Sequence, residues 1–292
     1  MENEPVAVLK SYPITLATEA IGSYAVLVNA NDIATAGAVP RWFLSTLLFP
    51  VGTSAFSIHR VMARLSAVCR QWDVTLCGGH TEITDAVNRP VVNGMMVGTV
   101  SREKLIDKRN IRSGDRVLLT KAVSVEGTAI IAREFGAELT RLGVARDYLD
   151  KCRRFLDHIG ILDEARIAAE FQGVCAMHDV TEGGLATALE ELSAASGHRI
   201  RVDMDKIPIY SETRRICELL IINPLGLIGS GSLLICCREQ AADMLVQKIK
   251  EAGIQVTIIG EVCDAGKGIE AVRRRRPTEW PRFEADEITR LF

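Results

Sequence analysis

Two patterns of hydrophobic and polar residues occur along this chain: apolar residues at helical spacing and short continuous apolar runs. They predict helices and strands in alternation. Apolar residues spaced three and four apart predict a helix over Ser57–Trp72, with Val61 and Leu65 on its buried face. Short apolar runs predict buried strands at Phe43–Phe49 and Pro90–Val100. The first hundred residues therefore combine helices with strands of a sheet.

The second half of the chain continues this alternation. Further helices are predicted at Val125–Glu134, Leu149–Phe171, Gly184–Ser196, Thr213–Leu220 and Gln240–Ala252, and further strands at Asp73–Cys77, Arg116–Thr120, Gly173–Met177, Leu233–Cys237 and Val256–Val262. The turn-forming cluster Arg112–Asp115 precedes a fresh strand and predicts a domain boundary there. We expect an α+β fold with domains at residues 1–110 and 111–292.

Composition excludes several classes of protein. With 48% hydrophobic residues, 25% charged residues and a formal net charge of −2, the chain can form a large core and has no basic excess to attract nucleic acid or an anionic membrane. The run Arg273–Arg276 lacks interleaved aromatic residues and is typical of a solvated turn. No signal pattern or membrane-spanning run is present, so we expect a cytoplasmic protein that binds neither nucleic acid nor membrane.

The eight cysteines have no Cys-x-x-Cys spacing, and most lie in apolar surroundings. This pattern argues against a zinc site or a disulfide framework and favours reduced thiols in the core.

Three polar clusters interrupt or end apolar segments and are the candidates for chemistry. They are Asn29–Asp32, Cys77–Glu82 and Met177–Gly184. Paired glycines let backbone N–H groups approach a phosphate, and nearby carboxylates suit the Mg²⁺ that such a phosphate carries. On this basis the phosphate donors would be Gly78, Gly79, Gly183 and Gly184, and the metal ligands Asp32, Glu82 and Asp179.

Each cluster also has a purely structural interpretation. Asp32 could cap a helix, Gly78–Gly79 could form a hairpin turn, and Thr181–Glu182 could begin a capped helix. His80 and His178 titrate near neutrality and are candidate general acids or bases, although a single histidine is more often a hydrogen-bonded structural residue. The glycine-rich segment Gly226–Ser232 lacks the Gly-Lys-Ser/Thr ending of a phosphate loop and is interpreted as a close-packed turn.

Taken together, the clusters resemble a known superfamily. The motifs VNANDIATAGAVP, CGGHTEIT, MHDVTEGGLATALEELSAASG and NPLGLIGSGSLLI occur in this order from about Lys10 to Val262. They are similar to the aminoimidazole ribonucleotide synthase-like (PurM-like) superfamily, and the overall pattern is nearest to its hydrogenase maturation (HypE-like) branch.

The resemblance implies a fold and an activity. The expected fold has an N-terminal α+β domain that forms a β-barrel across a homodimer and a C-terminal α+β domain, with ATP and Mg²⁺ bound. The expected activity is ATP-dependent activation, or dehydration, of a carbonyl or amide group, in concert with a maturation partner protein. The implied nucleotide-binding residues are Asn29, Asn31, Asp32, Gly78, Gly79, Thr81, Gly183 and Gly184.

The chain departs from the family pattern at identifiable positions. It begins close to the strand that carries Tyr12, where the family has an Asp before Pro, and it has His80 where many members place an acid. No Cys follows Cys263, so we expect no carbamoyl acceptor at the C-terminus. These departures leave two alternatives open: another small-molecule synthetase or kinase of the superfamily, and a non-catalytic dimeric scaffold.

Overall fold

The computed structural model describes residues 4–15 and 20–292. The chain folds into two compact units, Met1–Leu105 and Ile106–Phe292. The short segment 106–110 belongs with the second unit because its helical turn η2 (Lys108–Asn110) contacts that unit's elements, and the Asn110 carbonyl accepts a hydrogen bond from Arg238. The structural division therefore falls five residues before the predicted boundary at residue 110.

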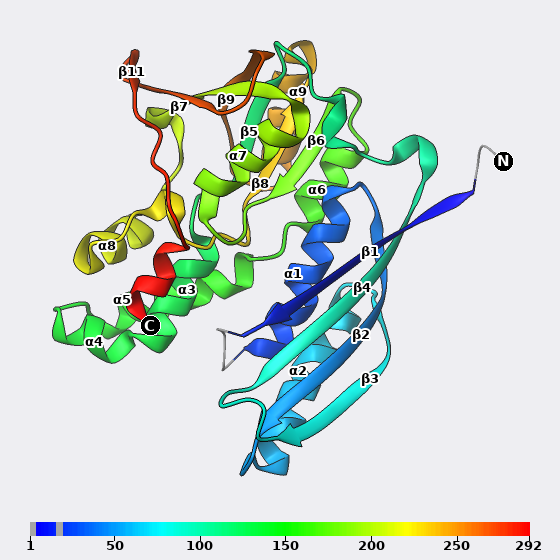
Figure 1. The fold of residues 1–292 in the computed structure, drawn as a ribbon, viewed down its shortest axis with the longest axis vertical. Helices are drawn as coiled ribbons and strands as arrows, with labels where there is room; N and C mark the ends of the chain where they lie inside the picture. Colours follow the sequence, from blue (N-terminus) through cyan, green and yellow to red (C-terminus); the bar gives the residue numbers. More distant parts are fainter. Residues whose placement is uncertain (1–3, 16–19) are drawn as a thin grey trace. The chain divides into compact units, whose positions relative to one another are not determined.

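The first unit is a four-stranded sheet with two helices on one face (Figure 1). Its elements are β1 (Pro5–Ile14), α1 (Ile21–Thr35), β2 (Val39–Pro50), α2 (Ala55–Gln71), β3 (Thr75–Thr84), β4 (Val91–Ser101) and the turn η1 (Arg102–Lys104). The strand order is β1-β4-β2-β3, with β2 and β3 parallel and the other neighbours antiparallel. The predicted helix at Ser57–Trp72 is confirmed, and Ser54 caps it by accepting a hydrogen bond from the Ser57 N–H.

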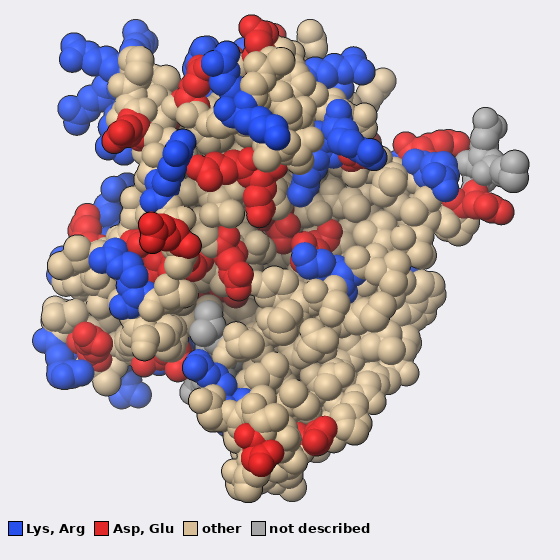
Figure 2. All heavy atoms as spheres, viewed as in Figure 1, with Lys and Arg blue, Asp and Glu red and all other residues tan. Residues whose placement is uncertain are grey.

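The second face of this sheet carries exposed apolar side chains, and α1 and α2 leave it uncovered. Register aligns Leu9, Val97 and Trp42 across three strands, and Met95 and Leu44 one step further along. Except for the half-buried Val97, all of these side chains are exposed. Figure 2 shows few charged side chains over this sheet. Within one chain the sheet is open, with β1 and β3 as its edges, so a single chain does not form the expected barrel.

The second unit is built on a seven-stranded mixed sheet in the order β11-β10-β7-β9-β5-β8-β6. Its strands are β5 (Arg116–Thr120), β6 (Val174–Asp179), β7 (His198–Asp203), β8 (Leu233–Cys237), β9 (Val256–Ala265), β10 (Ile269–Arg273) and β11 (Arg276–Thr278). Its longer helices are α3 (Val125–Glu134), α4 (Gly136–Arg141), α5 (Arg146–Arg153), α6 (Leu162–Ala169), α7 (Gly184–Ser196), α8 (Ser211–Leu220) and α9 (Glu239–Glu251). The two mixed sheets confirm the α+β class.

One hydrophobic core of this unit lies between α7 and one face of the sheet. Leu185, Leu189 and Leu192 form an apolar stripe on α7, and they pack in one cluster with strand residues such as Val117 and Ile259. Burial of these side chains stabilises the helix on the sheet. This places the N-terminus of α7, and the turn that precedes it, at a fixed position beside β6.

The predicted helix Leu149–Phe171 is wrong in its middle. The structure has α5, then a short helical turn η3 (Arg154–His158), and only then α6. The Lys121 ammonium donates to the carbonyls of His158 and Gly160, which takes these two backbone acceptors away from a continuous helix.

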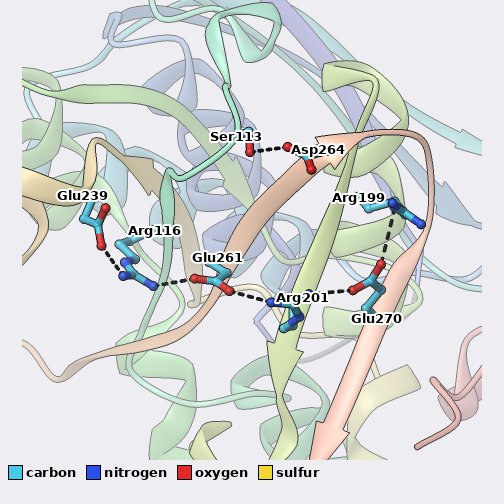
Figure 3. Close-up of polar contacts among 8 residues, drawn as sticks. All are labelled: Ser113, Arg116, Arg199, Arg201, Glu239, Glu261, Asp264 and Glu270. Carbon is cyan, nitrogen blue, oxygen red and sulfur yellow. Dashed lines mark hydrogen bonds and ion pairs between the residues drawn. The ribbon is translucent and has the colours of Figure 1, made fainter. Parts of the chain in front are cut away.

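Alternating charges link four neighbouring strands on one face of the second sheet. Figure 3 shows Arg116, Glu261, Arg201, Glu270 and Arg199 in sequence along β5, β9, β7 and β10. Successive partners are separated by 2.7, 2.9, 3.2 and 3.4 Å. Opposite charges on adjacent strands add cross-strand pairing energy, so the ladder supports the strand register.

Among the described residues, no helix is long and apolar enough to cross a membrane.

Candidate functional site

Asn29 and Asn31 are core residues of α1. Asn29 has no exposed surface, and its Nδ2 donates to the Ala25 carbonyl at 2.8 Å and the Tyr12 carbonyl at 3.3 Å. This side chain therefore ties α1 to β1. Its Oδ1 is buried with no hydrogen-bond partner within the described part of the chain, and such an orphaned acceptor fits a donor group that is not part of the protein. Asn31 is also buried.

Asp32 lies in the last turn of α1, so the interpretation that it caps the start of a helix is wrong. Its carboxylate lies 3.1 Å from the Lys10 ammonium of β1, and the side chain is 19% exposed. A carboxylate is disfavoured by the helix dipole at a C-terminal turn, and the Lys10 charge offsets this cost. Asp32 is thus a partly accessible carboxylate next to a cation.

The cluster Cys77–Glu82 does not follow a strand, as the sequence suggested, but lies inside one. β3 continues through Gly78 and Gly79 to Thr84, and a register shift in the pairing with β2 occurs beside Gly78. A Cβ at Gly79 would lie 1.9 Å from the Ser45 carbonyl oxygen, so glycine permits the close approach of the two strands. The hairpin-turn interpretation of these glycines is therefore also wrong.

His80, Thr81 and Glu82 are exposed along this edge strand. His80 Nε2 lies 3.5 Å from Glu82 Oε2, as expected for residues two apart on one face. Register places Glu82 beside Leu48, which lies on the sheet face that α1 and α2 leave uncovered.

Asp32 and Glu82 do not come together in one chain. Asp32 lies on the helix-covered face beside β1, whereas Glu82 is on the uncovered face of β3, at the opposite edge of the sheet. Glu82 would join a metal site with Asp32 only if a second chain brought it there. Asp179 belongs to the second unit, so its grouping with Asp32 stays a prediction.

His178 and Asp179 end β6 in buried positions. The imidazole Nε2 lies 2.9 Å from Glu191 Oε2 of α7, and Nδ1 lies 3.6 Å from Asp179 Oδ1. Burial lowers the pKa of His178, but the neighbouring carboxylates of Asp179 and Glu191 outweigh this effect, and the pKa lies above its ordinary value. The same contact with His178 lowers the pKa of Glu191. His178 therefore forms an ion pair that links β6 to α7.

Asp179 has a carboxylate oxygen available to a ligand. It is 3% exposed, and its Oδ2 has no hydrogen-bond partner in the residues that the structure describes. An unpaired buried carboxylate oxygen is costly and suits a cation or a donor. The described residues contain no group of three or more His, Cys, Asp or Glu suited to a metal. Mg²⁺ at nucleotide sites commonly uses one or two carboxylates, with phosphates and waters completing its shell, so Asp179 fits it.

Gly183 and Gly184 form a tight turn between β6 and α7. Both have positive φ, 72° and 61°, and a Cβ at Gly184 would lie 2.6 Å from the Leu225 carbonyl oxygen. Only glycine adopts this conformation at such close range without strain. The interpretation of Thr181–Glu182 as a capped helix start is replaced by a glycine N-cap at Gly183.

The Gly183 amide already holds an anion from the same chain. It donates to Asp286 Oδ2 at 2.7 Å, and the Ile228 amide donates to Asp286 Oδ1 at 3.2 Å. Ile228 lies in Gly226–Ser232, whose close packing is confirmed because a Cβ at Gly229 would lie 2.9 Å from Val180. The two loops together thus present amide donors to one carboxylate.

Glu126 is a buried acid behind these loops and is not among the site residues predicted from the sequence. It accepts a hydrogen bond from the Ser230 amide at 3.2 Å. The pKa of Glu126 is raised to about 7, mainly by burial; the hydrogen bond from Ser230 opposes this shift, and the nearby charges of Asp286 and Glu182 contribute to it. The sequence does carry a signal for Glu126, because an acidic residue inside the otherwise mainly apolar stretch Val125–Ala132 suggests a buried acid. Asp286 offered none, because it lies in a polar segment without periodicity.

An open four-stranded sheet with two helices, followed by a seven-stranded mixed sheet with a glycine turn, defines a two-domain α+β protein. Residues 3–100 match the N-terminal domain of AIR synthase related proteins, and residues 112–273 match the C-terminal domain. The chain belongs to the AIR synthase-related family. The carbamoyl dehydratase HypE of Cupriavidus necator is 28% identical over 283 residues, which cover 93% of this chain and 76% of that protein.

Solved structures show the same fold at lower identity. A hydrogenase maturation protein HypE in complex with ATP aligns with a TM-score of 0.81 and 19% identity, covering 99% of this chain and 88% of that one. A chain of a HypE–HypF complex aligns with a TM-score of 0.78 and 20% identity, covering 95% and 90% respectively.

Proposed function

We propose that this chain is a HypE-like hydrogenase maturation protein that binds ATP with Mg²⁺ and activates a carbonyl or amide group for dehydration. The observation that carries the proposal is the turn from Asp179 to Gly183, which combines an unpaired carboxylate oxygen with an anion-holding amide. Similarity to HypE proteins, one of them solved with ATP, supports the choice of nucleotide.

Each residue in the proposed site has a distinct role. ATP would supply the phosphoryl group, and Mg²⁺ would offset its charge. Asp179 and Asp32 would bind the metal, and the Gly183 amide would face a phosphate oxygen. The Gly184 amide donates to the Thr181 carbonyl at 3.0 Å, so Gly184 would shape the turn and would contact phosphate only if that hydrogen bond opened. Asn29 and Asn31 would support α1 beside Asp32.

Two histidines are the proposed proton carriers. His178 stands beside Asp179, and its raised pKa keeps it protonated to higher pH, which suits a donor of a proton to a leaving oxygen. His80 is exposed on β3 and would need the substrate or a second chain to approach it. Gly78, Gly79, Thr81 and Glu82 lie on the same strand, so their proposed nucleotide and metal contacts carry the same requirement.

We also propose that the first unit forms a homodimer through its uncovered sheet face. Exposed Leu9, Trp42, Leu44 and Met95 form one apolar surface there. Contiguous exposed apolar surface is unusual on a monomer and marks an interaction site. The HypE–HypF complex of a relative supports a maturation protein as a further partner.

Thermal-shift measurements with substrates separate this function from that of another synthetase or kinase in the family. Mg·ATP should raise the melting temperature, and an S-carbamoyl-cysteine peptide should raise it further only when Mg·ATP is present. Stabilisation by thiamine monophosphate instead would favour a kinase. If no nucleotide stabilises the protein at about 100 times a micromolar Kd, where linkage predicts about 2.7 kcal/mol, the scaffold alternative would stand.

A further inference from the structure

The C-terminal segment Glu279–Phe292 lies along the loops of the proposed nucleotide site. It follows β11 and contains only one short helical turn, η6 (Glu287–Leu291). Figure 1 shows it as the orange-to-red stretch that runs from β11 to the C-terminus. The ring of Phe283 covers Gly226, where a Cβ would lie 2.6 Å from it, and the ring of Phe292 lies 5.2 Å from that of Phe135.

Two acidic side chains attach this segment to backbone amides. Asp286 accepts from Gly183 and Ile228, and Glu287 Oε2 accepts from the Asn223 amide at 2.7 Å. Charge-assisted bonds of this kind are strong and directional. The Gly183 amide is also the donor that the proposed function assigns to a phosphate oxygen. One N–H cannot serve both acceptors fully, so the carboxylate and the phosphate exclude each other.

Two open pockets lie beside the segment and are lined partly by its residues. One of about 1290 Å³ is lined by Trp280, Pro281 and Arg282 together with Asn223 and other residues. The other, of about 660 Å³, is lined by Phe283 and Arg290, again with Arg282 and Asn223. Where a pocket opens beside the segment, the lining side chains are not packed against it, so fewer close contacts hold the segment there.

The environment of Asp286 also opposes permanent docking. Burial raises the pKa of Asp286 in spite of three amide hydrogen bonds, and the charge of Glu182 raises it further. The ionised side chain is therefore held less favourably than in water. Buried Ile288 and the rings of Phe283 and Phe292 supply the opposing, stabilising contribution.

We propose that Glu279–Phe292 is an autoinhibitory strap whose Asp286 carboxylate occupies the amides of Gly183 and Ile228, and that nucleotide phosphate binds there only when the strap withdraws. This inference rests on the proposed function and adds regulation to the same site. A strap docked in about nine molecules of ten leaves a competent fraction of about 0.1, which weakens the apparent nucleotide affinity about tenfold.

Calorimetry with Mg·ATP on full-length variants tests the strap. Asp286→Ala should bind about tenfold more tightly than wild type, because the competing carboxylate is gone. The matched control is Glu284→Ala, an exposed acid of the same strap, which should bind as wild type does. Asp286→Asn keeps the shape and the acceptor oxygen but lacks the charge, so its Mg·ATP affinity should lie between those of wild type and Asp286→Ala. This variant provides the test if the alanine variant does not fold.

Hydrogen exchange provides the second readout. Adding Mg·ATP to wild type should accelerate exchange at Ile288 and Thr289, whose amides are bonded within the docked strap. If wild type binds nucleotide but Asp286→Ala and Asp286→Asn bind no more tightly, the strap is refuted and the proposed function stands. If neither wild type nor these variants bind nucleotide, both are refuted.

Discussion

Glu126 allows a quantitative test of the buried acid behind the glycine loops. It lies on α3 with 4% of its surface exposed, and burial raises its pKa from 4.5 to about 7. Between these pH values the folded state binds more protons at this site than the unfolded state does. The stability of the wild type should therefore fall as pH rises through this interval.

The size of the effect follows from the pKa difference. At about 1.4 kcal/mol per pKa unit, a change from 4.5 to about 7 corresponds to about 3 kcal/mol lost by the time the acid is ionised in both states. Glu126→Gln is neutral at every pH and keeps an oxygen that can accept from the Ser230 amide. The variant should match wild type near about pH 4.5 and exceed it by about 2–3 kcal/mol near about pH 8.5.

Urea denaturation at a series of pH values measures this difference directly. Glu138→Gln, an exposed acid on α4, is the control and should show no such trend. A stability difference between Glu126→Gln and wild type that stays constant from acid to alkaline pH would refute the reasoning, since only a shifted pKa makes the difference depend on pH.

Three further predictions concern other parts of the molecule. Asp115 is 3% exposed and accepts two hydrogen bonds from Arg238. Asp115→Ala should therefore lower the free energy of unfolding, measured by urea denaturation, by about 2–3 kcal/mol, a value already reduced for the partial exposure of Arg238. A loss below about 0.5 kcal/mol would contradict this prediction. The pKa of His178 is raised and that of Glu191 is lowered. The ion pair should therefore stabilise the protein fully between about pH 4.5 and 6.5, and this stabilisation should be lost as the pH rises through the folded-state pKa of His178. His178→Gln should thus destabilise the protein more at about pH 6 than at about pH 9. Trp42→Glu on the uncovered sheet face should give monomers of 32.0 kDa by light scattering where wild type gives dimers, and a monomeric wild type would contradict the dimer.

The sequence predicted those elements whose pattern is strong and local. The ends of α3, β5, β8 and α7 agree with the structure because each is a continuous apolar or amphipathic run with clear boundaries. Gly78–Gly79 was misinterpreted because two glycines indicate a turn locally, whereas their role in β3 depends on the approach of β2 from elsewhere in the sequence.

The candidate site was only partly accessible to sequence reasoning. Gly183 and Gly184 were predicted as phosphate-binding residues, whereas the structure shows that positive φ and close approach select glycine at these positions. Its partner Asp286 lies more than 100 residues away along the chain, and only the folded structure brings the two together. Likewise, no periodicity indicates that Asp32 and Glu82 lie on opposite faces of one sheet.

Titration calorimetry with Mg·ATP tests whether Asp179 and Asp32 hold a nucleotide-bound metal. Wild type should bind Mg·ATP, and both Asp179→Asn and Asp32→Asn should weaken binding at least about tenfold, about 1.4 kcal/mol, because each removes a proposed metal ligand. Asp243→Asn, an exposed carboxylate on α9, should bind as wild type does. Absence of binding by wild type, or equal binding by all four proteins, would refute the proposed metal–nucleotide site.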